Sequence, residues 1–300
     1  MSDSQVANEV PARPAWLGED LYPFEGLYVD VDGSRVHYLD EGEGPVLLLM
    51  HGNPTWSFLY RNIIRGLSDR YRCIAIDYPG FGLSTARAGY TFMPGEHAAV
   101  VEQILLRLDL SDVTMMVQDW GGPIGFTVAT RQPERFSAFV VGNTWAWPHA
   151  NIRMAAFSRM LKNPVGKSLI LHRNLFVERV MPTGVKRGKL PEKVKDAYRG
   201  PFPTPESRIP TYVFPREILE SRATFLAEVE RGLSKLKDRP ALLVWPTGDI
   251  AFQEDERKRW ESVFPDHRTV ILEGAGHYIQ EDAPDEIVSA IREWSDARGV

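Results

Sequence analysis

The sequence predicts an α/β fold in which a mostly parallel sheet of eight strands is covered by helices on both faces and carries an inserted helical cap. Continuous apolar runs such as residues 45–50 and 113–117 indicate strands buried on both faces. Stretches with apolar residues at helical spacing, such as 93–110, alternate with these runs. The alternation stops at Asn143 and resumes only at Pro240, which indicates the insertion.

The amino-terminal half begins with a loose arm (1–20) and a hairpin. The arm has no basic start followed by an apolar core, so it does not resemble a secretory signal. Asp32-Gly33 between two alternating stretches is a strong hairpin signal and predicts two antiparallel edge strands, 26–31 and 34–39. Further strands are predicted at 45–50, 72–76, 113–117 and 136–142, with helices at 56–67, 93–110 and after Trp120.

The stretch from 144 to 215 is rich in helix formers, Arg, Lys, Pro and scattered aromatic residues, and it contains no convincing strand. A structureless loop of this length would be unusual in a compact domain, so a helical cap above the sheet is expected. Residues 21–143 and 216–300 then form the core. The remaining predicted elements are a helix at 216–235, a strand at 240–245, a helix at 252–263, a strand at 268–272 and a helix at 284–296.

Composition limits the classes of partner. The net charge of −5, with acids and bases interspersed, implies neither nucleic acid nor an anionic membrane as a partner. No apolar run approaches the length of a membrane span, and a cytoplasmic location is expected. Cys73, the single cysteine, excludes an intrachain disulfide and a thiolate metal cluster, and is expected to be a core residue. The many aromatic residues allow a homo-oligomer.

Asp119 follows a buried strand and precedes Trp120 and the glycine-rich sequence Gly-Gly-Pro-Ile-Gly. A strand that turns sharply into a helix is typical of a nucleophile elbow, which exposes its central side chain to substrate. An aspartate at such a junction is equally common as a helix cap. This stretch alone leaves both interpretations open.

Two further features lie just past predicted strands, where open α/β sheets bind their ligands. Asp249 follows the strand at 240–245, and His277 follows the strand at 268–272. A lone histidine in a glycine loop is more often structural than catalytic. The order Asp119, Asp249, His277, however, is the order of nucleophile, acid and histidine in the α/β-hydrolase fold. The three together favour catalysis.

An aspartate nucleophile determines which type of reaction is expected. Its carboxylate is ionised at neutral pH and can displace a leaving group from an alkyl carbon, which forms an ester. Water deprotonated by His277 would hydrolyse that ester, with Asp249 orienting the imidazole and the backbone N–H groups of Trp120 and Asn53 holding the oxyanion. Activity should then fall as His277 becomes protonated near its unperturbed pKa of about 6.5.

The neighbours of the nucleophile indicate what leaves. Trp120 offers an indole N–H and Asn53 offers two amide N–H bonds, and two neutral donors suit a departing halide. The alternatives are that Trp120 is a core aromatic residue and that Asn53 is a turn residue before Pro54.

These motifs resemble those of haloalkane dehalogenases over nearly the whole chain. The resemblance implies an Asp119 nucleophile, Trp120 and Asn53 as halide donors and a His277 base. It also implies a small halogenated aliphatic substrate, water and a halide product, without metal or organic cofactor. The stretches that carry it are Leu21-Tyr-Pro-Phe24, His51-Gly-Asn-Pro-Thr-Trp56, Asp77-Tyr-Pro-Gly-Phe-Gly-Leu-Ser84, Gln118-Asp-Trp-Gly-Gly122, Gly142-Asn-Thr-Trp145 and Ile279-Gln-Glu-Asp-Ala-Pro284.

The resemblance places the catalytic acid at one of two positions. One branch of the family has Glu where this chain has Asn143, and the other has Asp where this chain has Asp249, so the set resembles the third subfamily. The chain departs from the pattern at two places. Val117 occupies a position that is Gly in many elbows, and Pro246-Thr247 is an unfamiliar approach to Asp249.

Three rival functions share these features. An epoxide hydrolase would use cap tyrosines, for which Tyr198 and Tyr212 are available, but tends to have an aromatic residue in place of Asn53. A fluoroacetate dehalogenase resembles the chain less, because it carries Arg where Trp120 stands. A non-catalytic binding domain of the same fold would not need an acid and a base together.

Overall fold

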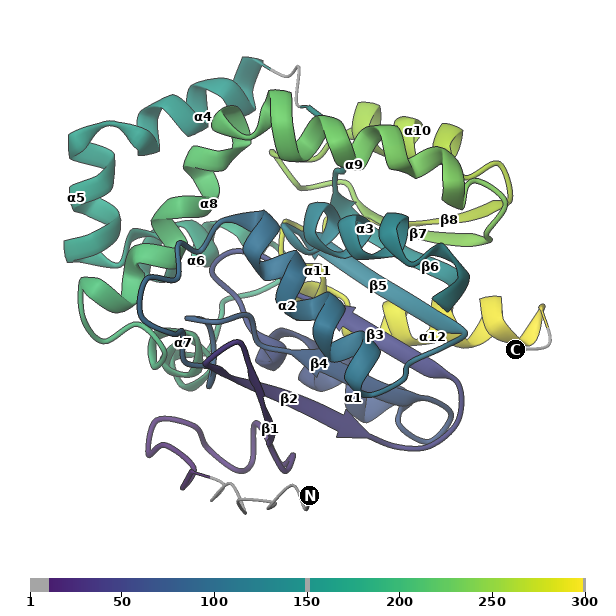
Figure 1. Cartoon of the computed structure of the whole chain (residues 1–300), viewed down its shortest axis with the longest axis horizontal. Coiled ribbons are helices and arrows are strands. Elements are labelled where there is room, and N and C mark those ends of the chain that lie inside the picture. Colours follow the sequence, from purple (N-terminus) through teal and green to yellow (C-terminus); the bar gives the residue numbers. More distant parts are fainter. Residues whose placement is uncertain (1–10, 149–151, 299–300) are drawn as a thin grey trace, which may run out of the picture.

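The computed structural model describes residues 11–148 and 152–298, so the first half of the predicted arm, residues 1–10, lies outside the described residues. One sheet of eight strands has the order β1-β2-β4-β3-β5-β6-β7-β8 and forms the centre of Figure 1. The strands are β1 (Leu27–Val31), β2 (Ser34–Glu41), β3 (Val46–Met50), β4 (Arg72–Ile76), β5 (Val113–Asp119), β6 (Phe136–Thr144), β7 (Ala241–Pro246) and β8 (His267–Leu272).

Pairing within the sheet confirms the predicted topology. β1 pairs with β2, and β2 with β4, in antiparallel orientation at one edge, whereas β3 to β8 are parallel. Val117 of β5 pairs with Met50 of β3 and with Val141 of β6. The carboxyl ends of these central strands therefore meet at one edge of the sheet, as the α/β-hydrolase fold requires.

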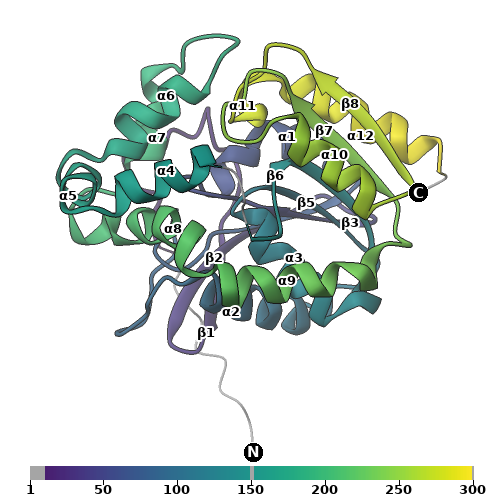
Figure 2. The ribbon, with the colours of Figure 1, turned by 90° about the horizontal axis from the view of Figure 1, so that it is seen from above.

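Helices cover both faces of the sheet. α1 and α12 pack on each other on one face, and α2, α3 and α9 pack together on the other face (Figure 2). α3 comes very close to the sheet because its first turn carries glycines, and all but one of its residues are buried. The core helices are α1 (Arg61–Leu67), α2 (Pro94–Arg107), α3 (Gly121–Arg131), α9 (Ala227–Gly232), α10 (Glu254–Val263), α11 (Ile279–Asp282) and α12 (Pro284–Asp296).

The segment between β6 and β7 is helical, as predicted, and lies beside the carboxyl ends of the central strands (Figure 1). One predicted helix, 216–235, is instead divided. α8 continues past residue 215, the expected end of the cap, and ends at Glu220. The hydroxyl of the next residue, Ser221, donates to the carbonyl of Glu217 at 2.6 Å. The cap elements are α4 (Ile152–Lys162), α5 (Pro164–Arg173), the π-helical turn η3 (Phe176–Val180), α6 (Met181–Gly184), α7 (Glu192–Arg199) and α8 (Ile209–Glu220).

Cys73 is fully buried in β4, and burial raises the pKa of its thiol to about 12. It is therefore a core residue with no reactive thiolate near neutral pH. In the part of the chain that the structure describes, no helix combines the length and apolarity that crossing a bilayer demands.

Candidate active site

Asp119 is the last residue of β5 and has a left-handed backbone, with φ of +50°. This conformation is unfavourable for a non-glycine residue and turns the chain sharply into α3. The hydroxyl of Thr144 donates to the carbonyl of Asp119 at 2.5 Å and thereby ties the turn to the end of β6. The local geometry is that of a nucleophile elbow, with the Asp119 side chain at the edge of the sheet.

Glycines make this elbow possible because the neighbouring backbones approach closely. A Cβ on Gly121 would lie 2.1 Å from the carbonyl oxygen of Met50, and one on Gly122 would lie 1.9 Å from the hydroxyl of Thr144. The departure at Val117 is accommodated from the helix side. Gly125 of α3 leaves room there, since a Cβ at that position would come within 3.2 Å of the valine methyl group.

The Asp119 carboxylate has two distinct oxygens. Oδ1 accepts the backbone N–H of Asn53 at 2.8 Å, whereas Oδ2 lies 3.6 Å from Nε2 of His277. Gly52 allows this approach, because a Cβ there would lie 2.4 Å from Oδ1. The loop after β3 thus presents a hydrogen-bond donor to one oxygen and leaves the other beside the imidazole.

His277 and Asp249 come from the loops after β8 and β7. Nδ1 of His277 lies 2.9 Å from Oδ2 of Asp249, and Oδ1 of Asp249 accepts the N–H of Ala251 at 2.7 Å. The unfamiliar sequence before Asp249 does not displace it: the Thr247 hydroxyl accepts the N–H of Gly274 at 2.7 Å and fixes the two loops to each other. The structure therefore brings together Asp119, His277 and Asp249, as the sequence analysis expected.

Two buried amides that the sequence analysis did not assign also contact this group. Nδ2 of Asn143 donates to Oδ2 of Asp249 at 2.8 Å and to the carbonyl of His277 at 2.5 Å. Nε2 of Gln118 donates to the same carbonyl at 3.1 Å and lies 3.2 Å from Nε2 of His277. Both amides hold the histidine loop in place. They lie at the carboxyl ends of β5 and β6, but this position alone does not distinguish a buried amide from other strand residues in the sequence.

The electrostatics of the site correct one expectation. Burial by itself lowers the pKa of His277, but the carboxylates of Asp249 and Asp119 raise it by more, to about 10. The two carboxylates therefore favour the protonated imidazole, which places the pKa of His277 above the expected 6.5 in the free protein. Burial raises the pKa of Asp249, but His277 and Asn143 lower it by more, so this carboxyl stays ionised.

Trp120 and Asn53 lie with Asp119 in the wall of one cavity. The Trp120 ring stacks on Phe214 of α8, with centroids 5.0 Å apart, and meets Trp145 edge-on at 4.8 Å. Among the residues that the structure describes, Nδ2 of Asn53 makes one long hydrogen bond, 3.3 Å, to the carbonyl of Thr211. The indole is thus held rigidly by aromatic packing, and the amide can exchange its weak bond for a ligand.

The cavity has a volume of about 270 Å³ and lies between the strand ends and the cap. Its floor is formed by Asp119 and its partners, and its roof is mostly apolar. Phe157 and Phe176 of the cap line it, and Phe176 also belongs, with Leu161, to a separate small core. The cap and loop residues around it are Arg153, Met154, Phe157, Phe176, Val180, Thr183, Gly184, Lys186, Pro215, Ile218, Ile250, Ala251 and Tyr278.

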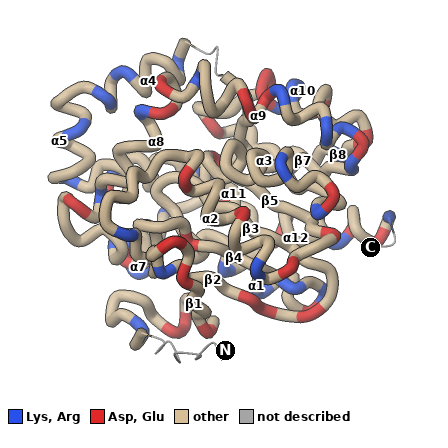
Figure 3. The backbone as a smooth tube through the Cα atoms, in the orientation of Figure 1, with Lys and Arg blue, Asp and Glu red and all other residues tan. Residues whose placement is uncertain are grey.

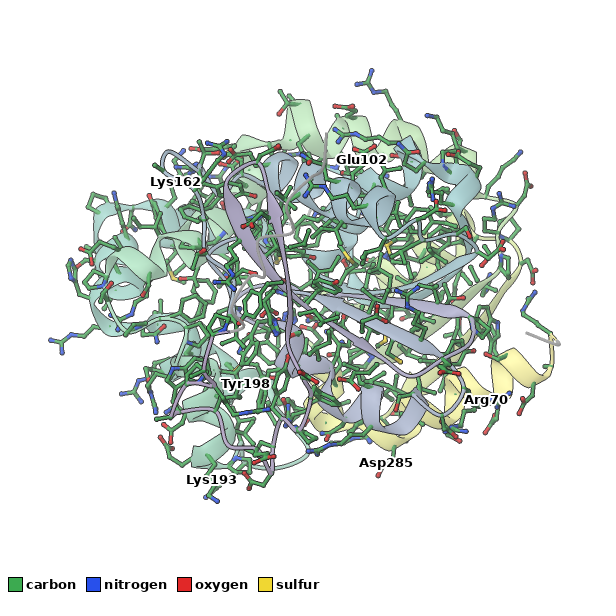
Figure 4. All side chains as sticks on the ribbon, turned by 60° about the horizontal axis from the view of Figure 1, so that its bottom comes forward. Arg70, Glu102, Lys162, Lys193, Tyr198 and Asp285 are labelled. Atoms are coloured by element: carbon green, nitrogen blue, oxygen red, sulfur yellow. The ribbon has the colours of Figure 1, made fainter. Side chains whose placement is uncertain are left out.

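The two cap tyrosines considered for an epoxide hydrolase do not line this cavity. The Tyr198 hydroxyl donates to Glu281, which is paired with Arg61. Figure 4 labels Tyr198 on the lower part of the cap. The Tyr212 hydroxyl donates to the carbonyl of Lys162 at 3.3 Å. Neither hydroxyl is directed to a substrate beside Asp119.

Comparisons with known proteins agree with this geometry. The family model described as the alpha/beta hydrolase fold matches residues 45–284. Haloalkane dehalogenase 2 of Mycobacterium tuberculosis is 45% identical over 275 residues, which cover 91% of this chain and 96% of the relative. A cis-3-alkyl-4-alkyloxetan-2-one decarboxylase of Shewanella oneidensis is 31% identical over 92% of this chain and 90% of its own length.

A solved structure is similar over the same range. The haloalkane dehalogenase DbeA of Bradyrhizobium elkani superposes with a TM-score of 0.83 at 27% identity, covering 91% of this chain and 98% of that one. The elbow, the strand order and the sequence similarity agree. The chain therefore belongs to the haloalkane dehalogenase family of the α/β hydrolases.

Proposed function

We propose that the protein hydrolyses small or medium haloalkanes to an alcohol, a halide and a proton through an ester on Asp119. One observation carries the proposal. A carboxylate at the floor of an apolar cavity lies 3.6 Å from Nε2 of His277, whose other ring nitrogen lies 2.9 Å from the buried Asp249. The assignment of Asp249 as acid and of the Asn53 and Trp120 pair, which resembles the third subfamily, is part of this proposal.

The first step is displacement at carbon. Oδ1 of Asp119 is held by the N–H of Asn53, so Oδ2 attacks the carbon that bears the halogen. The new C–O bond forms as the carbon–halogen bond breaks, and the halide leaves with the electron pair. The indole N–H of Trp120 and the side-chain amide of Asn53 donate to the departing halide. No proton moves in this step.

The second step is hydrolysis of the ester. Water attacks the carboxyl carbon of Asp119 as His277 takes one of its protons, and the N–H of Asn53 donates to the resulting oxyanion. Collapse breaks the bond from the carboxyl carbon to the alkyl-bearing oxygen, the former Oδ2 of Asp119, and the alcohol leaves with the proton that His277 had taken. One oxygen of Asp119 then comes from water, and the second water proton passes to solvent. The scheme uses neither a metal nor an organic cofactor.

Formation of the ester changes the charge around the base. An alkylated Asp119 is neutral, so one of the two carboxylates that raise the pKa of His277 is lost. Loss of this carboxylate lowers the pKa of His277 in the intermediate and so favours the neutral imidazole that the second step requires. Displacement of the halide thus prepares the base for the second step.

The first experiment measures three reactions side by side: halide release from a short bromoalkane, hydrolysis of styrene oxide, and loss of carbon dioxide from a cis-dialkyl β-lactone. The third arm is included because the Shewanella relative is named as an oxetan-2-one decarboxylase. The proposal expects halide release, abolished by Asp119→Asn. Turnover of the epoxide or lactone without halide release would contradict it, and inactivity towards all three would favour a binding domain.

A further inference from the structure

Four of the large apolar side chains that the fold leaves in solvent gather on α4 and α5. The exposed fractions are 83% for Ile152, 57% for Met160, 69% for Val165 and 42% for Leu169. We call the outward side of these two helices, residues 152–173, the α4–α5 surface. Figures 1 and 2 place α5 at the end of the molecule farthest from the carboxyl terminus.

The small core between α4 and α5 does not include these four side chains. α4 and α5 enclose a small separate core of Leu161, Ile170 and Phe176, against which Phe157 packs. Met160 is adjacent to a member of this core in sequence but points outward, as its exposure indicates. The exposed residues are therefore not used by this core and are available to another molecule.

The segment that carries this surface is cationic. No Asp or Glu occurs between residues 136 and 177, whereas five basic residues do: Arg153, Arg159, Lys162, Lys167 and Arg173. They appear in Figure 3 as blue segments along α4 and α5. The net charge of the whole chain does not reveal this local excess of basic residues. The expectation that anionic membranes are not partners therefore does not extend to the α4–α5 surface.

Two of these five cations, Arg153 and Lys162, have partners within the fold. Lys162, labelled in Figure 4, pairs with Glu220 of α8 at 2.6 Å. Among the described residues, Arg159, Lys167 and Arg173 have no carboxylate within ion-pair distance, and Lys167 lies over the ring of Tyr212 at 5.3 Å. The positive charge is therefore available to an external anion.

We propose that the α4–α5 surface docks on the anionic headgroups of a lipid bilayer. Amphipathic helices with apolar side chains among Lys and Arg bind in the interfacial plane, where the apolar groups enter the acyl boundary and the cations contact phosphates. A second copy of the chain suits the surface less well, because a two-fold contact through it would place two copies of the same cationic segment against each other. An anionic bilayer satisfies both the charge and the apolar side chains.

Docking would also bring the cavity to the lipid. α4 supplies Arg153, Met154 and Phe157 to the cavity wall and carries the exposed Ile152 and Met160 on other faces. If the proposed function holds, an apolar haloalkane dissolved in the bilayer would reach Asp119 past this helix. Only this consequence rests on the proposed function, because vesicle binding is measured without substrate.

The test is co-sedimentation of the full chain with vesicles of phosphatidylcholine mixed with phosphatidylglycerol, at low salt. The protein should pellet with these vesicles, remain in solution with phosphatidylcholine alone, and be released by added salt. The triple variant Arg159→Gln, Lys167→Gln and Arg173→Gln should bind about 100-fold more weakly, at roughly fivefold per cation. Its halide release from a water-soluble bromoalkane should be unchanged.

Two further variants separate charge from apolar contact and from nonspecific loss of charge. Met160→Gln with Val165→Gln keeps the cations and should also weaken binding. The matched control Arg231→Gln, Lys237→Gln and Lys258→Gln removes three exposed cations outside the α4–α5 surface and should bind like wild type. Circular dichroism and thermal unfolding establish that each variant is folded.

Three outcomes would overturn the proposal. The first is a wild-type protein that stays in solution with the mixed vesicles at low salt. The second is equal loss of binding in the control variant, which would mean that total charge alone attracts the protein. The third is a concentration-dependent dimer, seen by analytical ultracentrifugation without lipid and lost in the α4–α5 variants, which would identify a second copy as the occupant.

Discussion

Replacing Asp249 with Asn should separate the two chemical steps. Oδ1 of Asp249 accepts the fixed backbone N–H of Ala251 at 2.7 Å, and Oδ2 accepts Nδ1–H of His277 at 2.9 Å and Nδ2–H of Asn143 at 2.8 Å. An amide has only one oxygen, and the fixed backbone N–H of Ala251 will donate to it. The NH₂ group then faces His277, whose proton moves from Nδ1 to Nε2, so the nitrogen directed at Asp119 can no longer accept a proton from water.

The expected magnitude follows from this tautomer. An asparagine in place of the orienting acid costs about 10³- to 10⁴-fold in a histidine-assisted step, or about 4 to 5.5 kcal/mol of transition-state stabilisation. The variant also loses the carboxylate that raises the pKa of His277 most strongly. The displacement step uses neither the base nor the acid and should keep its rate within a few-fold. Ester hydrolysis alone should carry the loss.

Rapid-quench measurement of bromide checks both steps in one experiment. The variant should release about one bromide per active site at a near-normal rate and then turn over very slowly. Asp285→Asn, which removes an exposed carboxylate at the start of α12, is the control and should behave like wild type. Steady turnover within tenfold of wild type, or a burst lost together with turnover, would refute the role assigned to Asp249.

Three other changes test separate parts of the site. Trp120→Phe keeps the ring but removes the indole donor, and should slow the bromide burst about 10- to 100-fold while leaving ester hydrolysis unchanged. Gly52→Ala puts a Cβ 2.4 Å from Oδ1 of Asp119 and should abolish the burst, whereas Gly188→Ala, with nothing within 4 Å, should have no effect on the burst measured beside it. The raised pKa of His277 stabilises the fold fully below its unfolded value of about 6.5, and this contribution fades as pH rises through about 10. Denaturant unfolding at pH 6 to 10 should therefore show that the free energy of unfolding of the wild type falls with pH more steeply than that of His277→Gln. Equal slopes of the free energy of unfolding against pH for both proteins would contradict the assigned pKa.

Elements with local signals were predicted at or close to their observed limits. β4 lies at Arg72–Ile76, where an apolar run ends before Asp77, and α12 lies at Pro284–Asp296, where proline begins the helix. The cap, residues 144–215, was predicted to be helical, without limits for its individual helices. α5 ends at Asn174 in a left-handed conformation and is followed by a π-helical turn, and tertiary packing, not local pattern, decides such features.

The residues of the candidate site also differ in whether the sequence could predict them. Asp119, Asp249 and His277 could be predicted because residues that follow parallel strands meet at one edge of the sheet. Gln118 and Asn143 could not, since a buried amide has no distinctive pattern until its partners are known. The high pKa of His277 depends on the separation of three side chains from distant parts of the chain, which no local reading supplies.

The central claim is that Asp119 becomes covalently attached to the substrate. The most direct test is mass spectrometry of His277→Phe after incubation with a bromoalkane, followed by proteolysis. The variant should release one bromide per site, and the peptide that contains Asp119 should carry the alkyl group. An unmodified peptide in the variant, with bromide release by the wild-type protein intact, would contradict the two-step scheme.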